Sequence, residues 1–282
     1  KYKENLWVIA DGERKDRLAK NGLNINDKVY SLHIKTPAEA HGVDLLFVCT
    51  KYTQLRDSLP DIETITDKHT MVVSLLNGVD SEELIGQRIG MEHMIYSLIR
   101  IASHRIGNSI HFSLPKGYNG IYIGIPNQPA CQDPRLAAIA EIFADTPVTL
   151  HLSDDILLDM WDKFGLNVSR NLPQAILGVG IGVYDDSIYA DAIMRRMRHE
   201  VVLVANAKGI PLTDEFKAAK WLPSQRYSTL QDLDAHRHTE IDMFSGALIR
   251  MGKEVGVECP YNEMTYNLIK ALEEKNDGKF DY

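Results

Sequence analysis

The sequence has 282 residues, of which 44% are hydrophobic, and carries a formal net charge of −8 at pH 7. This length favours two domains with a sizeable core, and the negative charge argues against a protein that binds nucleic acid or an anionic membrane surface. No apolar run reaches the roughly 20 residues needed to cross a bilayer. The three widely spaced cysteines, Cys49, Cys131 and Cys259, suggest neither a disulfide framework nor a zinc site. We therefore expect a reduced, cytoplasmic compartment.

The first half of the chain alternates short apolar runs with helical segments, which is the pattern of an open parallel sheet. Its apolar runs are continuous, as expected of strands that are covered on both faces. A helix is predicted over Arg14–Asn21. The predicted strands are Leu6–Ala10, Asp44–Cys49, Met71–Leu76, 110–113 and 120–123.

From about Asp154 onwards, helical periodicity replaces the strand pattern. Two apolar helix faces are predicted, one from Ile193, Met197, Val201 and Val204, the other from Ile241, Phe244, Leu248, Met251 and Val255. We therefore divide the chain into an α/β domain over residues 1–153 and an all-helical domain over 154–282. The polar tail Glu273–Tyr282 is expected to fray.

Polar residues follow two of the predicted strands. Lys51 and Gln54 come after the strand that ends at Cys49, and Asn77 follows the strand that ends at Leu76. Open α/β sheets bind ligands just outside the carboxyl ends of their strands, so these three residues are candidates for cofactor contacts. The alternative is that a turn after a strand simply favours such residues. The sequence leaves both interpretations open.

Lys163, Asn167 and Asn171 recur every four positions in the second half. On an α-helix this spacing places them along one side, with a drift of about 40° per step. A cation followed by two amides suits a cleft that holds a carboxylate and donates to an oxygen, whereas a solvated stripe is the alternative. Two asparagines inside a helix cost helix propensity, which favours a functional role.

Glu240 is predicted to share a helix face with Phe244, Ala247 and Met251, at the edge of the buried side. A carboxylate there needs a partner, and a lysine from another helix could serve. The alternative is an exposed glutamate at a helix start, favoured by the helix dipole. The ten histidines show no metal-ligand spacing, so no metal site is expected. No nucleophile motif supports covalent hydrolase chemistry either.

Four motifs in the same order, VCTKxxQ, LLNGVxxEE, WDKFGLNVSRN and HRHTEID, resemble the ketopantoate (2-dehydropantoate) reductase family. The resemblance covers essentially the whole chain. It implies a Rossmann-like α/β domain followed by an all-α domain, with the active site between them. It also implies an NAD(P)H-dependent reductase of a 2-oxo acid.

The resemblance implies roles for individual residues of this sequence. Lys163 matches the catalytic lysine, the general acid that protonates the carbonyl oxygen, and Glu240 matches the acidic residue that contacts the substrate hydroxyl and supports that lysine. Asn167, Asn171 and Ser228 match residues that bind the hydroxyl and carboxylate groups of the substrate. A positioned ammonium would stabilise and neutralise the charge that develops on the carbonyl oxygen during reduction.

The implied cofactor contacts lie in the first half. Asn77 matches the strand-end asparagine near the nicotinamide ribose, and Lys51 and Gln54 match other cofactor-side positions. At the end of the first predicted strand, Asp11 suits the free ribose of NAD, whereas Arg14, followed by two further cations, could bind the 2′-phosphate of NADP. We expect NADPH as the cofactor, with NADH as the alternative.

The sequence departs from the family at its start. The family's first strand and its G-x-G-x-x-G phosphate loop do not precede Leu6, which resembles the family's second strand. The glycines of Gly178–Gly182 follow no predicted strand and are no substitute. Judged by the usual length of a βαβ unit, we expect about 25 to 30 residues of a dinucleotide-binding half to be missing. We expect the sequence to be part of a longer chain, since a sheet without its central strand would expose two apolar edges.

The function implied is the reduction of ketopantoate to pantoate in pantothenate and coenzyme A synthesis. One alternative is a paralogue that reduces another branched 2-oxo acid, because nothing in the sequence identifies the far end of the substrate. A second alternative is a non-catalytic, ligand-binding relative. The expected partner is a small-molecule 2-oxo acid, and a homodimer is left open.

Overall fold

A computed structural model describes residues 4–101, 103–106, 109–113, 117, 119–216, 222–280 and 282. The chain folds into two compact units. The first unit comprises Lys1–Leu76 and Ser81–Ile156, and the second comprises Asn77–Asp80 and Leu157–Tyr282. The short segment Asn77–Asp80, which follows a strand of the first unit along the chain, thus belongs to the second.

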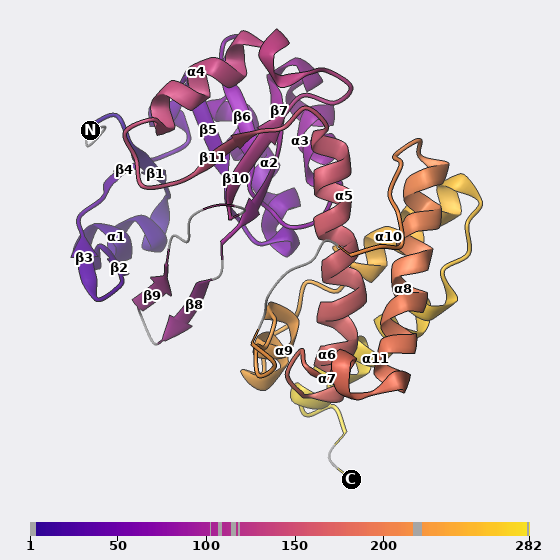
Figure 1. The fold of residues 1–282 in the computed structure, drawn as a ribbon. Helices are drawn as coiled ribbons and strands as arrows, with labels where there is room; N and C mark the ends of the chain where they lie inside the picture. The colour runs from indigo at the N-terminus through magenta and orange to yellow at the C-terminus, as the bar shows by residue number, and fades with distance from the viewer. Residues whose placement is uncertain are drawn as a thin grey trace. The chain divides into compact units, whose positions relative to one another are not determined.

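The first unit is an α/β structure (Figure 1). Its strands are β1 (Trp7–Ile9), β2 (Leu23–Ile25), β3 (Lys28–Tyr30), β4 (His33–Lys35), β5 (Leu45–Val48), β6 (Met71–Ser74), β7 (Met94–Arg100), β8 (Ser103–Ile106), β9 (Ser109–Phe112), β10 (Gly120–Gly124) and β11 (Leu150–Leu152). Its helices are α1 (Gly12–Asn21), α2 (Tyr52–Ile65), α3 (Ser81–Ile89) and α4 (Pro134–Phe143), with 3₁₀ turns η1 (Ala38–Ala40), η2 (Met91–His93) and η3 (Ala130–Gln132).

The main sheet has five strands in the order β11-β10-β7-β6-β5. Strands β5, β6 and β7 are parallel, and β10 runs antiparallel to β7. Leu136 and Ile139 of α4 pack on this sheet against Val73 and Ile95. The predicted strands at 44–49 and 71–76 are confirmed as β5 and β6. The predicted burial on both faces holds for most of β6, whereas in the edge strand β5 buried residues alternate with partly buried ones.

The first predicted strand is confirmed as β1, but it lies outside the main sheet. It pairs in parallel with β4 to form a separate two-stranded sheet. Across the described ranges no strand pairs with the second edge of β1 or with the outer edge of β5. Both edges therefore carry backbone groups that the neighbouring strands do not satisfy.

A third sheet, in the order β3-β2-β9-β8, was predicted only in part. The prediction at 110–113 corresponds to β9, whereas β2, β3 and β8 were not predicted. These strands have three or four residues each. Segments this short give neither a continuous apolar run nor a measurable alternation.

The second unit is helical in the part of the chain that the structure describes, and the last described strand is β11. Its elements are α5 (Ile156–Leu166), the π-helical turn η4 (Asn167–Asn171), α6 (Leu172–Leu177), α7 (Val183–Asp186), α8 (Ile188–Ala207), α9 (Ser228–Asp234), α10 (Ser245–Val255) and α11 (Pro260–Asn276). Helices α8, α10 and α11 pack on one another (Figure 1).

The predicted apolar face of α8 is correct except at one end. Met197, Val201 and Val204 are fully buried. The prediction for Ile193 is wrong, because its side chain is 41% exposed and the buried row continues through Met194 instead. Ile193 and Met194 are both apolar, so the periodicity could not decide which of them begins the buried row.

The predicted fraying of the tail is wrong for residues 273–276, because α11 extends to Asn276 and Glu273 is only 3% exposed.

The start of α11 is bound by a buried carboxylate. Glu200 of α8 accepts hydrogen bonds from the backbone N–H groups of Tyr261 (2.8 Å) and Asn262 (3.0 Å). These are donors that the first turn of a helix leaves unsatisfied.

Candidate functional site

Lys163 lies on α5 with a half-buried side chain. Its Nζ donates a hydrogen bond of 2.8 Å to Oδ1 of Asn77. Both residues belong to the second unit, since Asn77 begins the segment Asn77–Asp80. The bond uses one of the three donors of the ammonium and fixes the direction of the lysine side chain. The structure therefore brings together two residues that were predicted to have separate roles.

The segment Asn77–Asp80 also contacts the chain near Glu240. Gly78 has a φ of 96°, which favours glycine, and a Cβ atom built on it would lie only 2.8 Å from Cγ of Met243. Met243 is fully buried and follows Glu240 by three residues. The same four-residue segment thus touches Lys163 on one side and the Glu240 turn on the other.

The prediction that Glu240 lies on a helix is wrong. Helix α10 begins at Ser245, and Glu240 occupies a turn before it. The carbonyl oxygen of Glu240 accepts from the backbone N–H groups of Met243 (3.0 Å) and Phe244 (3.2 Å), which closes this turn. The expected lysine partner is not seen either, because no described residue forms a hydrogen bond or ion pair with the half-buried carboxylate.

Asn167 and Asn171 lie in the π-helical turn η4 rather than in a regular α-helix. Two features explain this wider turn. Ser169 Oγ donates to the carbonyl oxygen of Gly165 (2.7 Å), and Pro173 has no N–H to offer to the turn before it. On a regular α-helix, residues spaced by four drift around the axis by about 40° per step. A π-helical turn holds more than four residues, so the turn from Asn167 to Asn171 counteracts this drift.

The two asparagines have different surroundings. The buried Asn171 donates through Nδ2 to Ser228 Oγ (3.3 Å) and accepts through Oδ1 from the backbone N–H of Thr229 (3.3 Å). It therefore caps the start of α9, and Ser228 keeps its own hydroxyl proton for another acceptor. Asn167 is partly exposed, and its amide makes no hydrogen bond to any described residue.

A buried arginine that no sequence motif indicated anchors α5. Arg198 of α8 is 1% exposed, and its guanidinium donates to the carboxylate of Asp162 (3.3 Å) and to the carbonyl oxygen of Thr213 (2.9 Å). A Cβ atom on Gly165 would lie 2.1 Å from Arg198 Nη1, so only glycine permits this approach. Burial lowers the pKa of Arg198, and the charge of Asp162 opposes this effect. The position of α5, and with it Lys163, depends on this pair.

In the first unit, Lys51 and Gln54 begin α2 directly after β5. Lys51 is the N-cap residue, and the backbone N–H of Gln54 bonds to its carbonyl oxygen (2.9 Å). Between β5 and Lys51, the hydroxyl of Thr50 is buried and has no hydrogen-bond partner among the residues described. A buried polar atom of this kind costs free energy unless a ligand satisfies it. This strand end therefore fits a bound polar molecule.

Arg14 lies in the first turn of α1, which starts after Asp11 at the end of β1. Its side chain is exposed. Of the neighbouring cations, Lys15 forms an ion pair with Glu39 (3.2 Å), whereas Arg17 is exposed like Arg14. A backbone hydrogen bond from Thr36 and the contact with Lys15 lower the pKa of Glu39 to about 2.

The glycines of Gly178–Gly182 do not form a phosphate loop. The backbone N–H of Ile181 bonds to Gln225 O (3.0 Å), and that of Gly182 bonds to Pro223 O (2.9 Å). Amides that are already paired within the chain cannot also bind a phosphate. The motif holds the segment before α9 in place.

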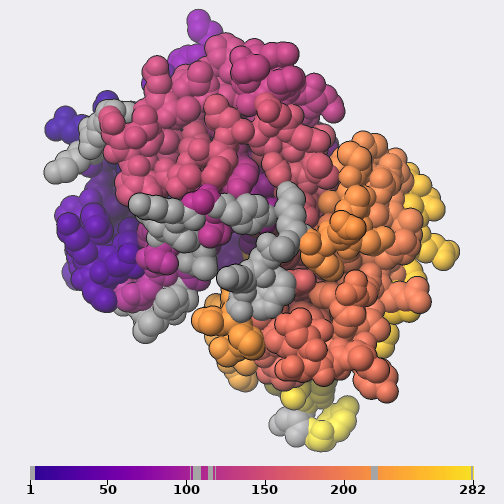
Figure 2. Space-filling view, in the orientation of Figure 1, coloured from indigo at the N-terminus to yellow at the C-terminus, as the bar shows by residue number. Residues whose placement is uncertain are grey.

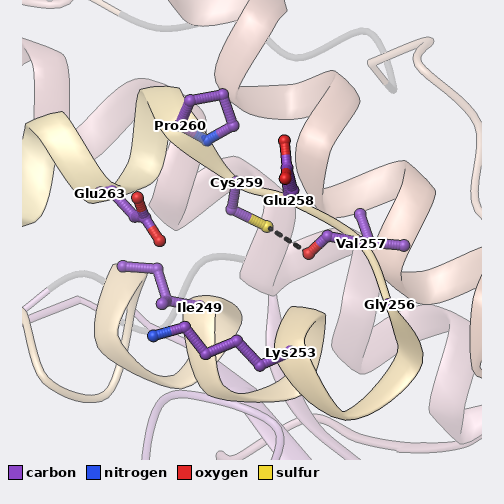
Figure 3. A pocket seen from close by; sticks show the side chains of 8 residues that line it. All are labelled: Ile249, Lys253, Gly256, Val257, Glu258, Cys259, Pro260 and Glu263. Carbon is purple, nitrogen blue, oxygen red and sulfur yellow. Dashed lines mark hydrogen bonds between the residues drawn. The ribbon is translucent and has the colours of Figure 1, made fainter.

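A cavity of about 540 Å³ lies where α10 ends and α11 begins (Figure 3). None of the predicted site residues lines it. Its cysteine, Cys259, is a poor nucleophile, because burial and the nearby Glu200 raise the pKa of its thiol to about 12. In the described ranges no group of His, Cys, Asp and Glu could hold a metal ion, and no helix is long and apolar enough to span a membrane.

Comparison with known proteins gives matches along both units. The family model described as "Ketopantoate reductase PanE/ApbA" matches residues 1–128. The model described as "Ketopantoate reductase PanE/ApbA C terminal" matches residues 155–273. Together they include all of the predicted site residues.

Individual relatives agree with these models. A 2-dehydropantoate 2-reductase of Streptococcus pyogenes is 29% identical over 272 residues, which cover 91% of this chain and 86% of the relative. Among solved structures, a D-mandelate dehydrogenase with NADH and anilino(oxo)acetate matches with a TM-score of 0.81 and 25% identity, covering 96% of this chain and 91% of that one. A ketopantoate reductase from Ralstonia eutropha has a TM-score of 0.77 at 24% identity, with the same two coverages.

Proposed function

The chain belongs to the ketopantoate reductase family of NAD(P)H-dependent oxidoreductases, and we propose that it reduces ketopantoate to pantoate with NADPH. This reaction is a step of pantothenate and coenzyme A synthesis. The main support is the ammonium of Lys163, oriented by Asn77 beside the turn that carries Glu240. An oriented proton donor is what the reduction of a carbonyl group requires.

Lys163 acts as the general acid. A bound nicotinamide supplies the hydride that reaches the carbonyl carbon. The ammonium of Lys163 donates a proton to the carbonyl oxygen, so an alcohol forms and the lysine is left neutral. Asn77 accepts from the ammonium at 2.8 Å and keeps it directed at one point. The carboxylate of Glu240, which no described residue engages, accepts a hydrogen bond from the substrate hydroxyl.

Two further residues, Asn167 and Ser228, bind the polar groups of the substrate, and Asn171 supports Ser228. The amide of Asn167 donates to an oxygen of the oxo acid, since no described residue competes for it. Ser228 donates its hydroxyl proton to the substrate, because Asn171 already donates to Ser228 Oγ. Asn171 thus acts chiefly by orienting Ser228. Amide and hydroxyl donors suit a carboxylate and a hydroxyl group.

Lys51, Gln54, Asn77 and Arg14 would hold the cofactor. The buried, unsatisfied hydroxyl of Thr50 supports a ligand at the end of β5. The exposed guanidinium of Arg14 supports NADPH over NADH, because it can pair with a 2′-phosphate. NADH is the alternative, and the D-mandelate dehydrogenase relative is described with that cofactor.

The proposal predicts that reduced cofactor is consumed when ketopantoate is added, measured by the loss of its near-ultraviolet absorbance. The rate should be higher with NADPH than with NADH. Phenylglyoxylate, the oxo acid of mandelate, serves as the second substrate, because one relative is a mandelate dehydrogenase. A preference for phenylglyoxylate would indicate that the substrate is an aromatic 2-oxo acid and not ketopantoate. Activity with neither compound nor with other branched 2-oxo acids would favour a non-catalytic binding protein.

We also propose that two copies of the chain associate through α8. Ile188 and Tyr189 are each 78% exposed at the start of this helix, and Ile193, which is 41% exposed, lies one turn after Tyr189 on the same side as that residue. Atoms in the colours of α8, salmon to orange, are visible on the surface in Figure 2. Asp186 precedes the helix start and the exposed Arg196 lies further along it, so an antiparallel pairing would bring opposite charges together.

The dimer predicts that Tyr189→Glu yields a monomer at concentrations where the unchanged protein is dimeric. A carboxylate buried in this apolar interface would oppose association. The measurement is molar mass by light scattering after size exclusion. Met264→Glu is the control, because Met264 is 65% exposed on α11 and lies outside the proposed interface. A monomeric unchanged protein would refute the proposal.

A further inference from the structure

The turn that carries Glu240 is fastened to α11 on both sides of that residue. Before it, the backbone N–H and the hydroxyl of Thr239 both donate to Oε1 of Glu273, at 2.7 and 2.6 Å. After it, Asp242 accepts from the hydroxyl of Tyr266 (2.7 Å) and from Nζ of Lys270 (2.8 Å). The four residues 239–242 therefore have a fixed place relative to α11.

Lys270 connects these two sets of hydrogen bonds, because it contacts both Asp242 and Glu273. Its Nζ lies 2.8 Å from Asp242 and 3.3 Å from Oε2 of Glu273, one helical turn away on α11. Burial by itself lowers the pKa of Lys270, but the hydrogen bond and charge of Asp242, together with Glu273, raise it above its usual value. His238 also faces Glu273, at 3.8 Å. The lysine is thus held as a cation between two carboxylates.

Nothing else in the described structure holds the side chain of Glu240. Its carboxylate has no partner there, while its neighbours Thr239 and Ile241 are buried. Its direction is therefore set by the backbone of the turn, and the backbone is set by the bonds to α11. A displacement of the reacting groups by about 1 Å is enough to reduce a rate by orders of magnitude.

We propose that Glu273 and Lys270 are positioning residues, which hold the turn 239–242 so that Glu240 faces the substrate. They touch neither substrate nor cofactor and act through Glu240 alone. This inference rests on the proposed role of Glu240. It assigns a catalytic contribution to the ion pair between the half-buried Lys270 and the buried Glu273 in the second half of α11, a pair whose bonds would otherwise be interpreted as purely structural.

The test compares two buried glutamates. Glu273 lies on α11 and binds the turn 239–242, whereas Glu200 lies on α8 and binds the start of α11. Glu273→Gln removes the charge that binds Lys270, and Glu200→Gln removes the one that caps the start of the helix. We expect Glu273→Gln to lower kcat on the order of 10-fold and to leave the KM for NADPH unchanged. Glu200→Gln should lower the melting temperature but not kcat. An equal loss of kcat in both variants, at matched loss of thermal stability, would overturn the proposal.

A local pair of variants and a double variant complete the test. Thr239→Val removes the hydroxyl donor and should slow the enzyme, whereas Thr239→Ser keeps it and should restore the rate. In a Glu240→Ala background, Glu273→Gln should cause no further loss, since its effect runs through Glu240. A full additional loss there would refute the positioning role. If Glu240→Ala alone were as fast as the unchanged enzyme, the proposed function of Glu240 would fail instead.

Discussion

Replacing Lys163 by alanine should lower kcat for ketopantoate reduction by ~10² or more, which is the scale of lost general acid catalysis. The variant keeps the helix, because alanine is the best helix former and the lysine side chain is only half-buried. It removes the one proton donor that Asn77 orients. The transition state would then develop negative charge on the carbonyl oxygen with no cation to neutralise it. Steady-state kinetics with saturating NADPH measure the effect.

The control for this variant is Lys253→Ala on α10. Lys253 is an exposed lysine of the same unit that lines the cavity in Figure 3, so its loss removes a cation without touching Lys163. Its kcat should stay within twofold of the unchanged enzyme, about the effect of a neutral surface substitution. A near-normal rate for Lys163→Ala would exclude the role assigned to it.

The largest expected effect on stability comes from Arg198→Ala. This arginine is 1% exposed, pairs with Asp162 and lies over the ring of Phe216, with 5.1 Å between its Cζ and the ring centroid. Its removal takes the guanidinium away from the half of the pair that stays behind, the carboxylate of Asp162, and opens a cavity. Breaking a buried pair in this way costs about 3–5 kcal/mol of the free energy of unfolding, to be measured by urea denaturation.

Arg195→Ala, three residues earlier on the same helix, provides the comparison. Arg195 pairs with Asp191 at 2.7 Å, but its side chain is 66% exposed. Exposed pairs of this kind contribute only about 0.3–0.5 kcal/mol. A loss below about 1 kcal/mol for Arg198→Ala would show that the buried pair does not anchor α5.

The sequence could predict β5 and β6 of the main sheet because each contains a run of consecutive apolar residues. Leu45–Val48 and residues 71–73 are apolar without interruption, and this is characteristic of strands covered on both faces. The polar residues after them, such as Lys51, could be placed at strand ends for the same reason. The resemblance to a known family suggested what position alone could not, namely the roles proposed for Lys163 and Glu240.

The error at Glu240 has a physical cause. Ile241 and Phe244 fit the spacing of a helix face, and both are buried as that pattern predicts. They belong to a turn, however, because Thr239 and Asp242 bond to α11. Such contacts between distant parts of the sequence leave no trace in local periodicity. The buried Glu273 was missed for the same reason, since only its bonds to Thr239 and Lys270 explain its burial.

The wide turn of Asn167–Asn171 acts as a one-residue shift between α5 and α6. Lys163 precedes this turn and donates to Asn77. Gln174 follows the turn, and its side chain bonds to Gln225 O and to the backbone N–H of Tyr227. Each α-helical residue turns the chain by about 100°. Losing or gaining a single residue within the turn would therefore rotate these two sets of contacts away from each other. The number of residues between Lys163 and Gln174 is therefore a structural constraint of its own, in addition to their chemical identities.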